Sequence, residues 1–210
     1  MRPVICLITP AVRNTQGEAE LLQRMAAAAR AGVRLIQVRQ TGMDGGALSH
    51  LVRRAVEVVR GTGARVLVND RVDVALAAGA HGVHLRGDSV AASRVRSVAP
   101  EGFVIGQSVH SQEEASRAAL GGGLDFLVFG TVFDSGSKPD VPGAGTTRLA
   151  ATCQAVPLPV LGVGGMIPVR LRDVAAAGAA GFAAIGLFAE TSTEQFPDLI
   201  HKANAAFDDC

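Results

Sequence analysis

Polar side chains that could bind phosphate and a divalent cation follow five short apolar segments of the chain. Arginine and lysine donate hydrogen bonds to anionic oxygens, whereas aspartate supplies the hard oxygen ligands that Mg²⁺ prefers. If the apolar segments are parallel strands that end at one mouth, these side chains converge there and predict a site for phosphates with magnesium. The polar groups are Gln37 and Arg39, then Asn69 and Asp70, then His84, Arg86 and Asp88, then Gln107, Ser108 and His110, and finally Thr131, Ser135, Ser137 and Lys138.

A glycine-rich turn adds a second feature that is typical of phosphate binding. The apolar run Val160–Val163 passes into Gly164 and Gly165, and Pro168 marks the expected start of a helix. Glycines let backbone N–H groups approach an anion closely, and a helix N-terminus adds partial positive charge. Gly186 ends the next apolar run. In a (β/α)8 barrel the loops after the last two strands often share one phosphate site, so both turns are expected to form a cup.

The elements that must position these groups are indicated by short β-branched runs alternating with longer segments rich in Ala, Arg and Glu. The runs are almost continuously apolar, which favours parallel strands covered by helices. The pattern predicts one domain over residues 1–210, folded as a single-domain (β/α)8 TIM barrel of the α/β class. The predicted strands are residues 4–8, 35–39, 66–69, 82–85, 104–109, 126–132, 160–163 and 182–185.

Local signals mark where several helices begin and end. Thr15 and Ser111 each precede a glutamate by three positions, which is the capping-box pattern of a helix start. Gly79 and Gly178 each stand in the sequence Ala-Ala-Gly-Ala and predict helix stops. The longest irregular stretch, residues 134–145, is rich in Gly, Ser, Pro and Asp and is the best candidate for a lid.

Composition excludes several classes of partner. A net charge of +1 without a basic block gives no electrostatic signature for nucleic acid or for a membrane surface. Cys6, Cys153 and Cys210 are odd in number and scattered, which argues against a disulfide framework or zinc site and favours a reducing cytoplasm. Cys6 is expected to be a small buried residue. No segment reaches membrane-spanning length, so we expect a soluble protein.

In their order along the chain, the motifs resemble the thiamine phosphate synthase and TenI superfamily over nearly the whole sequence. The resemblance implies a barrel that binds thiazole phosphate and, in the synthase branch, hydroxymethylpyrimidine diphosphate. The synthase joins the two into thiamine phosphate and releases diphosphate. The matching motifs are Gln37-x-Arg39, Asn69-Asp70, residues 82–85, Ser108-x-His110, residues 129–133 with Ser137-Lys138, and residues 162–165.

The resemblance also implies roles for individual residues. The expected diphosphate ligands are Gln37, Arg39, Asn69, Ser108 and Lys138, with Ser135 and Ser137 as further candidates for substrate binding. Asp70 is expected to bind Mg²⁺, and Gly164, Gly165, Ile185 and Gly186 to frame the thiazole phosphate. Arg39, Ser108 and Lys138 are candidate catalytic residues, because fixed donors and cations stabilise a departing diphosphate without any protein nucleophile. His110 is the fourth candidate, as an acid and base. Barrels of this family often associate, so a homo-oligomer is an open alternative to a monomer.

Two motifs depart from the synthase pattern. The pattern usually continues Gln-x-Arg-Glu-Lys after the second strand, but this chain has Gln40 and Thr41, which removes one cation from the expected diphosphate site. The pattern also places a second magnesium aspartate five residues beyond the histidine of the fourth strand. Here that position is Ser89, and Asp88 one position earlier is the candidate replacement.

Three other functions stay open at this stage. A TenI-like thiazole tautomerase would use His110 as acid and base, since histidine titrates near neutrality. A barrel that keeps the phosphate cup but has lost Lys at position 41 and Asp at position 89 could be a regulatory protein that binds thiazole phosphate without catalysis. An aldolase of sugar phosphates is disfavoured because no lysine lies in any of the eight runs.

Several of these residues also have a purely structural interpretation. Gly164 and Gly165 could serve only close packing between helix and strand, and Asn69 and Asp70 could cap a helix that begins near Val72. Arg39 could pair with a neighbouring carboxylate.

Two further side chains have similar structural alternatives. Lys138 could be a solvated charge in a loop. His84 is expected to be structural, because its spacing from His81 argues against a shared metal.

Overall fold

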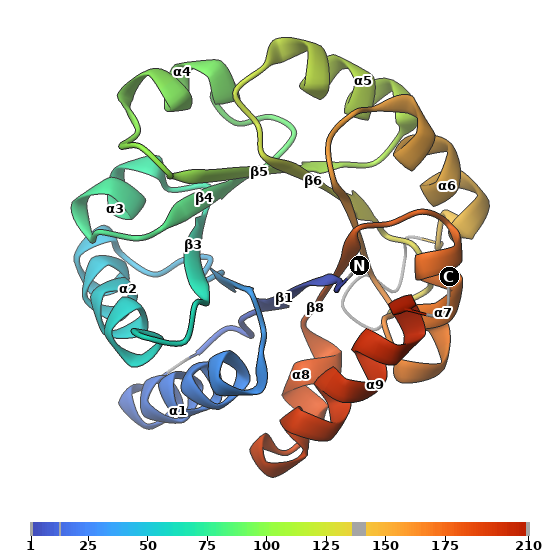
Figure 1. Ribbon diagram of the computed structural model, residues 1–210. Helices are drawn as coiled ribbons and strands as arrows, with labels where there is room; N and C mark the ends of the chain where they lie inside the picture. Colours follow the sequence, from blue (N-terminus) through green and yellow to red (C-terminus); the bar gives the residue numbers. More distant parts are fainter. Residues whose placement is uncertain (1, 13, 136–141, 209–210) are drawn as a thin grey trace.

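The wall of the central barrel consists of short parallel strands, each hydrogen-bonded to the next (Figure 1). The computed structural model describes residues 2–12, 14–135 and 142–208, and in these residues the eighth strand pairs with the first, which closes the sheet. The predicted (β/α)8 barrel is therefore confirmed. The strands are β1 (Val4–Ile8), β2 (Leu35–Val38), β3 (Arg65–Asn69), β4 (Gly82–Leu85), β5 (Val104–Val109), β6 (Phe126–Gly130), β7 (Val160–Val163) and β8 (Gly181–Ala184).

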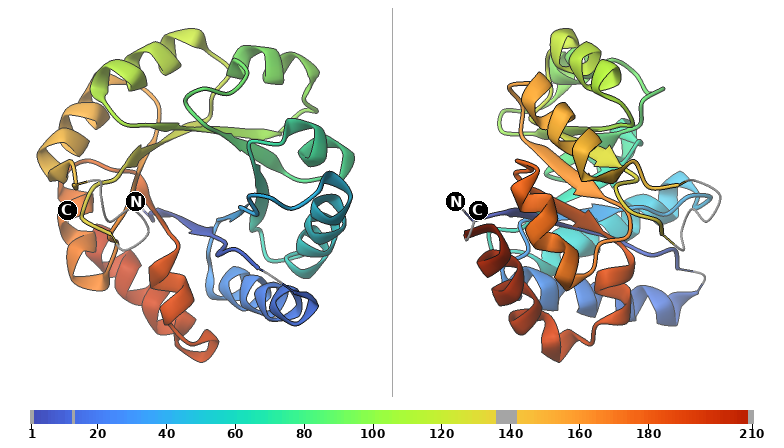
Figure 2. Two further views of the ribbon diagram at one scale, coloured as in Figure 1. Left: turned by 180° about the vertical axis from the view of Figure 1, so that it is seen from behind. Right: turned by 90° about the vertical axis from the view of Figure 1, so that its right-hand side faces the viewer.

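Helices surround the barrel on its outside (Figures 1 and 2), because a tight turn cannot join neighbouring parallel strands. In the described residues no helix is long and apolar enough to cross a membrane. The helices are α1 (Thr15–Ala31), α2 (Gly45–Val58), α3 (Val72–Ala77), α4 (Ala92–Val98), α5 (Gln112–Gly121), α6 (Gly145–Ala155), α7 (Leu171–Ala176), α8 (Gly186–Glu190) and α9 (Phe196–Asp208), with 3-10 turns at η1 (Pro168–Arg170) and η2 (Thr193–Gln195).

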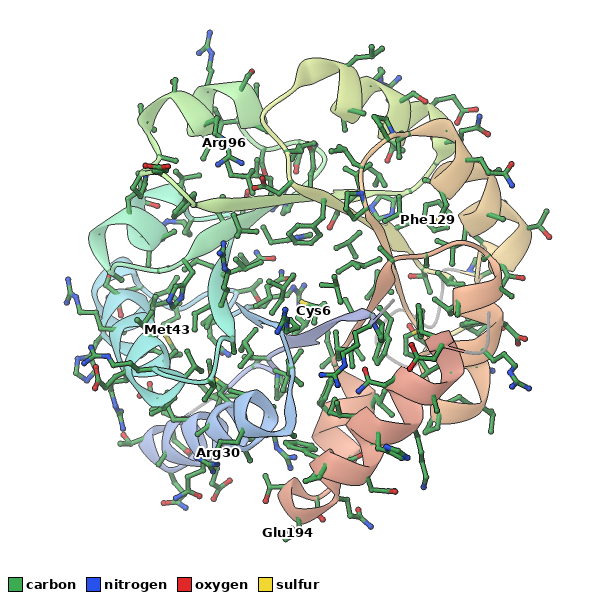
Figure 3. The ribbon with its side chains drawn as sticks, viewed as in Figure 1. Cys6, Arg30, Met43, Arg96, Phe129 and Glu194 are labelled. Atoms are coloured by element: carbon green, nitrogen blue, oxygen red, sulfur yellow. The ribbon has the colours of Figure 1, made fainter. Side chains whose placement is uncertain are left out.

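The hydrophobic core has two parts, as the barrel geometry requires. The larger part fills the layer between strands and helices, and the smaller one lies inside the barrel, where Leu67, Phe126 and Leu161 are among its members. Cys6 from β1 also lies in this interior (Figure 3), and burial raises the pKa of its thiol to about 12. The expectation that Cys6 is a small buried residue is confirmed.

The predicted strands agree with the structure except for one or two residues at the ends of β2, β3, β6 and β8. The predicted second and sixth strands are too long, because β2 ends at Val38 and β6 at Gly130. Arg39 and Thr131 therefore belong to the loops that follow these strands, where side chains can turn towards the barrel mouth.

The start of α1 corrects one capping prediction. Thr15 is the first helical residue, and the cap is Asn14, whose side-chain oxygen accepts a hydrogen bond of 2.8 Å from the Gly17 N–H. Asparagine is an equally good N-cap, and here its side chain reaches the free N–H groups one residue earlier than the capping-box pattern indicated.

The predicted cap of α5 is confirmed, and it also fixes a residue of the mouth. The Ser111 hydroxyl accepts a hydrogen bond from the Glu114 N–H at 3.1 Å. The Glu114 carboxylate accepts from the His110 N–H at 2.7 Å, one residue before the expected partner. The helix start therefore anchors the backbone of His110. The predicted helix stops are also confirmed, since Gly79 and Gly178 follow α3 and α7 with φ angles of 68° and 81°.

Gly82 provides a test of how tightly the barrel wall is packed. A Cβ atom at this position would lie 2.1 Å from the Val104 carbonyl oxygen and 2.6 Å from the Leu67 side chain. We expect Gly82→Ala to lower the free energy of unfolding by about 1–3 kcal/mol, measured by urea denaturation. Gly121→Ala is the control, because nothing lies within 4 Å of its Cβ position, and it should change stability by no more than about 0.5 kcal/mol. Equal stability of the two variants would contradict the close packing.

Candidate active site

A cavity of about 560 Å³ opens at the carboxyl ends of the strands, where the chemistry of this fold is expected. It brings together side chains from loops that are far apart in the sequence. Of the predicted site residues, it is lined by Gln37, Arg39, Asn69, Asp88, Ser108, His110, Ser135, Gly164 and Ile185, and it also contacts Thr41, His84, Arg86 and Thr131. Ser137 and Lys138, with half of the predicted lid, lie outside the described residues.

A second cavity of about 390 Å³ adjoins the first between the loops after β7 and β8. The two cavities share Ser135, Val163, Gly164 and Ile185, and the second adds Gly165 and Gly186 to its lining. The structure therefore brings all four predicted residues of the glycine cup to one place, directly beside the larger cavity.

Backbone conformation and packing require glycine in the first turn of this cup. Gly164 and Gly165 have φ angles of 103° and 61°, and Cβ atoms there would lie 2.5 Å from the Thr131 side chain and from the Asp134 carbonyl oxygen, respectively. The alternative that the two glycines serve close packing is thus supported as well. In the described part of the chain the Gly165 N–H has no hydrogen-bond partner, so it is also available to a ligand.

Arg170 is a residue of the cup that the sequence analysis missed. Its guanidinium donates a hydrogen bond of 2.8 Å to the Gly165 carbonyl oxygen and lies 4.8 Å from the centre of the Phe133 ring. A permanent positive charge therefore stands at the wall of the smaller cavity. Its place two residues after Pro168, at the start of the expected helix, was the only signal in the sequence.

Two amide side chains, one buried and one half-buried, line the larger cavity. The Gln37 side-chain N–H donates to the Asn69 side-chain oxygen at 2.9 Å, and Gln37 is 3% exposed. With its oxygen occupied, Asn69 presents its amide N–H groups, while Gln37 presents its amide oxygen. The pair thus offers one donor and one acceptor to a ligand.

Ser108 is held by a buried histidine. The His84 Nε2 atom lies 2.8 Å from the Ser108 hydroxyl oxygen, and burial lowers the pKa of His84 to about 4, against a smaller opposing effect of the Asp70 charge. His84 is therefore neutral, and its buried Nδ1 atom has no hydrogen-bond partner among the described residues. A buried N–H without a partner is rarer than a buried bare acceptor, which favours the proton on Nε2. The Ser108 hydroxyl then accepts from His84, and its own hydrogen is available to a ligand.

A network of four side chains joins the ends of β3 and β4. Asp70, with a left-handed φ of 63°, accepts a short hydrogen bond from the Ser89 hydroxyl and lies 3.8 Å from the Arg86 guanidinium. Arg86 also binds both carboxylate oxygens of Asp88, one of them through an Nε–H contact of 2.9 Å. This contact lowers the pKa of Asp88 and raises that of Arg86.

His110 has a defined tautomer at the edge of the cavity. Its Nδ1 atom makes a short hydrogen bond to the Gly130 carbonyl oxygen. A carbonyl can only accept, so Nδ1 carries the proton and Nε2 has a free lone pair when the ring is neutral. His110 can therefore accept a proton from a group bound in the cavity.

Comparison with known proteins assigns the chain to a family. The chain matches the family described as thiamine monophosphate synthase over residues 5–188. The chain belongs to the thiamine monophosphate synthase family. A thiamine-phosphate synthase of Roseiflexus castenholzii is 38% identical over 185 residues, covering 88% of this chain and 80% of that protein. One of Methanoculleus marisnigri is 42% identical over 165 residues, covering 78% and 77%.

Solved structures agree with this assignment. The thiamine phosphate pyrophosphorylase from Pyrococcus furiosus superposes with a TM-score of 0.82 and is 27% identical, with 96% of each chain covered. A 3-hexulose-6-phosphate synthase, 17% identical with a TM-score of 0.71, shows the fold alone. The resemblance to the synthase and TenI superfamily is confirmed at the level of the family.

The two departures from the synthase pattern at the end of β2 have different consequences. Gln40 is buried, and its side chain binds the loop after β1 through hydrogen bonds with the Pro10 carbonyl oxygen at 2.8 Å and the Val12 N–H at 2.9 Å. Gln40 therefore positions the backbone and does not reach the cavity. Thr41 lines the cavity, so a neutral hydroxyl stands where the pattern has a lysine.

A magnesium ion, implied by the family resemblance, fits the end of β3 only in part. Asp70 and the Ser89 hydroxyl offer hard oxygen ligands side by side, but Asp88 is bound to Arg86 in this structure and is not directed at Asp70. No three His, Cys, Asp or Glu side chains of the described ranges converge on one point. Neither Asp70 nor Ser89 is among the residues that line the larger cavity, although Asn69 beside Asp70 is. The residues present therefore fit Mg²⁺ only where one carboxylate is completed by the phosphate oxygens of a substrate.

The structural alternatives for three residues of the family motifs are not supported. Neither Asn69 nor Asp70 caps α3, since the residue at its N-cap is Arg71 and no side chain bonds there. The Asn69 side chain binds Gln37, and that of Asp70 binds Ser89. Among the described residues, Arg39 has no carboxylate within ion-pair distance, and its side chain is exposed to the cavity.

The interpretation of His81 and His84 as separate residues is supported. His81 accepts a hydrogen bond from the Val66 N–H through Nδ1 at 3.0 Å, before β4 begins, whereas His84 faces Ser108 near the mouth. The two rings therefore have different hydrogen-bond partners, one before the strand begins and one near its carboxyl end.

The depressed pKa of His84 makes stability depend on pH. Between pH 6.5 and 4 the unfolded chain binds a proton at this ring and the folded protein does not, so the free energy of unfolding falls as the pH is lowered. The contribution approaches about 1.4 kcal/mol per pH unit. We expect His84→Gln to remove this slope, measured by urea denaturation at several pH values, and His201→Gln on the exposed face of α9 to retain it. An unchanged slope in His84→Gln would show that the ring titrates alike in both states.

Proposed function

We propose that this protein is a thiamine phosphate synthase, which joins hydroxymethylpyrimidine diphosphate to thiazole phosphate and releases diphosphate. The observation that carries the proposal is the pair of connected cavities at one mouth, one lined by cations and amides and the other by glycines. Identities of 38% and 42% to proteins named thiamine-phosphate synthase support it.

The larger cavity suits the diphosphate substrate. Negative charge accumulates on the leaving diphosphate as its C–O bond breaks, so donors that are already in place stabilise the transition state more than the ground state. Arg39, the Asn69 amide and the Ser108 hydroxyl are such donors in our proposal, and Lys138 is a further one by family resemblance. The positive charge left on the pyrimidine methylene delocalises into the electron-rich ring.

Mg²⁺ is part of this proposal. When bound, the ion would neutralise charge on the diphosphate oxygens. Asp70 would hold it, with the Ser89 hydroxyl adjacent, and the neutral His84 ring keeps Ser108 directed at the same substrate group. The chain's own task is thus to position the diphosphate.

The smaller cavity suits the monophosphate of the thiazole. Its backbone donor at Gly165 and the nearby cation of Arg170 would hold the phosphate, with Ile185 and Gly186 as the opposite wall. The thiazole nitrogen would then face the larger cavity across the shared residue Gly164. Attack by that nitrogen needs only positioning, because the substrate itself supplies the nucleophile.

The proposed substrates are small phosphorylated molecules, and we place the enzyme in the cytoplasm, without nucleic acid or membrane as a partner. Cys6 and Cys153 are free cysteines in the described residues, as a reducing compartment favours. Assembly into a homo-oligomer remains an expectation from the family.

An assay of both substrates with Mg²⁺ tests the proposal, with release of diphosphate and formation of thiamine phosphate as readouts. Asp70→Asn keeps the shape of the side chain but removes its charge, so we expect kcat/KM to fall by about 100-fold or more. The half-saturating concentration of Mg²⁺ should rise in the same variant.

Asp73→Asn is the matched control for this experiment. Asp73 is an exposed carboxylate in the same stretch of chain. It binds Arg71 and does not line the cavity. Its activity should stay within about twofold of the parent protein, as for surface substitutions away from the site. Lack of product with the parent protein at any Mg²⁺ concentration would refute the synthase proposal.

The geometry of His110 favours a second candidate, a thiazole tautomerase. The free lone pair on Nε2 could accept and return a proton during aromatisation of the thiazole. Such a reaction should proceed without Mg²⁺ and collapse in His110→Ala, measured by the absorbance change on aromatisation. Retention of activity in that variant would remove His110 from the mechanism. Calorimetric binding of thiazole phosphate with both assays blank would instead indicate a protein that only binds this ligand.

A further inference from the structure

The charge balance of the larger cavity points to a cation that the family resemblance did not assign. Among the described residues that line this cavity, the lysine and arginine side chains are Arg39 and Arg86. Arg39 and Thr41 follow β2, whereas Arg86 follows β4. One strand, β3, separates β2 from β4 in the barrel wall. The cavity therefore lacks a cation at position 41 but has one at position 86.

We propose that Arg86 binds the diphosphate of the substrate and takes over the part of the missing lysine at position 41. The inference rests on the proposed synthase function and deepens it. A guanidinium donates two parallel hydrogen bonds to phosphate oxygens, which makes arginine well suited to a diphosphate. The Arg86 side chain is 58% exposed, and it is followed by Gly87, which also lines the cavity without a side chain to obstruct it.

The partners of Arg86 explain how it is held before a ligand arrives. Asp88 binds its guanidinium with both oxygens, and Asp70 lies 3.8 Å away. The Ser89 hydroxyl accepts a hydrogen bond of 2.8 Å from the Arg86 N–H, which fixes the backbone of this loop. The Asp88 side chain is 70% exposed, and an ion pair between such exposed groups is stabilised by little free energy. A diphosphate, which carries several negative charges, can therefore displace Asp88 from Arg86.

A second pair in the chain has the same local geometry without the cavity. Arg71 binds both oxygens of Asp73, at 2.8 and 2.6 Å, with the same spacing of two residues and at the end of the neighbouring strand β3. Arg71 does not line the cavity, and its guanidinium lies against α2 near Gly45. The two arginines thus differ in position but not in pairing, which makes Arg71 a matched control.

Isothermal calorimetry with inorganic diphosphate tests the proposal without requiring turnover. We expect Arg86→Gln to raise Kd by about 10–100-fold, as for loss of hydrogen bonds to a charged group, and Arg71→Gln to leave it unchanged. Adding Thr41→Lys to Arg86→Gln should restore much of the affinity, because it returns a cation to the same cavity. In metal-free buffer, Asp88→Asn should bind diphosphate more tightly than the parent, since it removes the competing carboxylate.

Steady-state kinetics separate this role from a structural one. Arg86→Gln should raise KM for the pyrimidine diphosphate and leave KM for the thiazole phosphate unchanged, because the smaller cavity lies on the other side of the mouth. Equal Kd values for inorganic diphosphate in Arg86→Gln and the parent would overturn the proposal, as would failure of Thr41→Lys to restore any affinity. Weaker metal-free binding in Asp88→Asn would contradict the displacement of Asp88.

The outcomes also distinguish this inference from the proposed function. If no thiamine phosphate forms but Arg86→Gln still weakens diphosphate binding, the synthase proposal fails and the role of Arg86 stands. If the parent enzyme is active and Arg86→Gln binds diphosphate as the parent does, the synthase proposal stands and the role of Arg86 fails.

Discussion

Closure of the parallel sheet is the constraint on which the rest of this structure depends. Because β8 pairs with β1 and every strand runs in the same direction, all strands deliver their carboxyl ends to one mouth. Residues as distant in sequence as Gln37 and Ile185 become neighbours of one cavity without any long-range signal of their own. The helices outside the barrel and the apolar interior bear the stability, so the loops of the mouth are free to carry polar groups that do not pack.

The mouth is organised by hydrogen bonds that leave selected donors available. Gln37 occupies the oxygen of Asn69 and so directs its N–H groups outward. His84, kept neutral by burial, occupies the oxygen of Ser108 in the same way. Both arrangements consume acceptors and expose donors, which is what recognition of an anion requires. The buried residues Gln37 and His84 therefore determine which hydrogen-bonding groups Asn69 and Ser108 present to the cavity.

The sequence was sufficient to predict the barrel and many of the polar residues at its mouth, although not Arg170, because both follow from local patterns. Apolar runs identify strands, and the polar residue after a strand must stand at the mouth once all strands are parallel. The interactions among these residues could not be predicted in the same way. Pairing of Asp88 with Arg86, and of Asp70 with Ser89, depends on the left-handed backbone of Asp70 and on the turn after β4. Likewise Gln40 and Thr41 are adjacent in sequence, yet only the turn of the chain decides that Gln40 is buried and Thr41 faces the cavity.

The glycine cup and the larger cavity differ in how many residue types could perform the same task. In the proposed phosphate site the backbone of the glycine cup would itself approach the ligand, and a side chain at Gly164 or Gly165 would collide with the neighbouring loop. A side chain on another strand cannot replace this close approach of the backbone. Recognition in the larger cavity, as we propose it, would rest on charge, and a diphosphate offers several oxygens around which cations can be arranged in more than one way. In our proposal an arginine after β4 therefore balances the lysine absent after β2, whereas a side chain in place of the glycines after β7 would collide with the neighbouring loop.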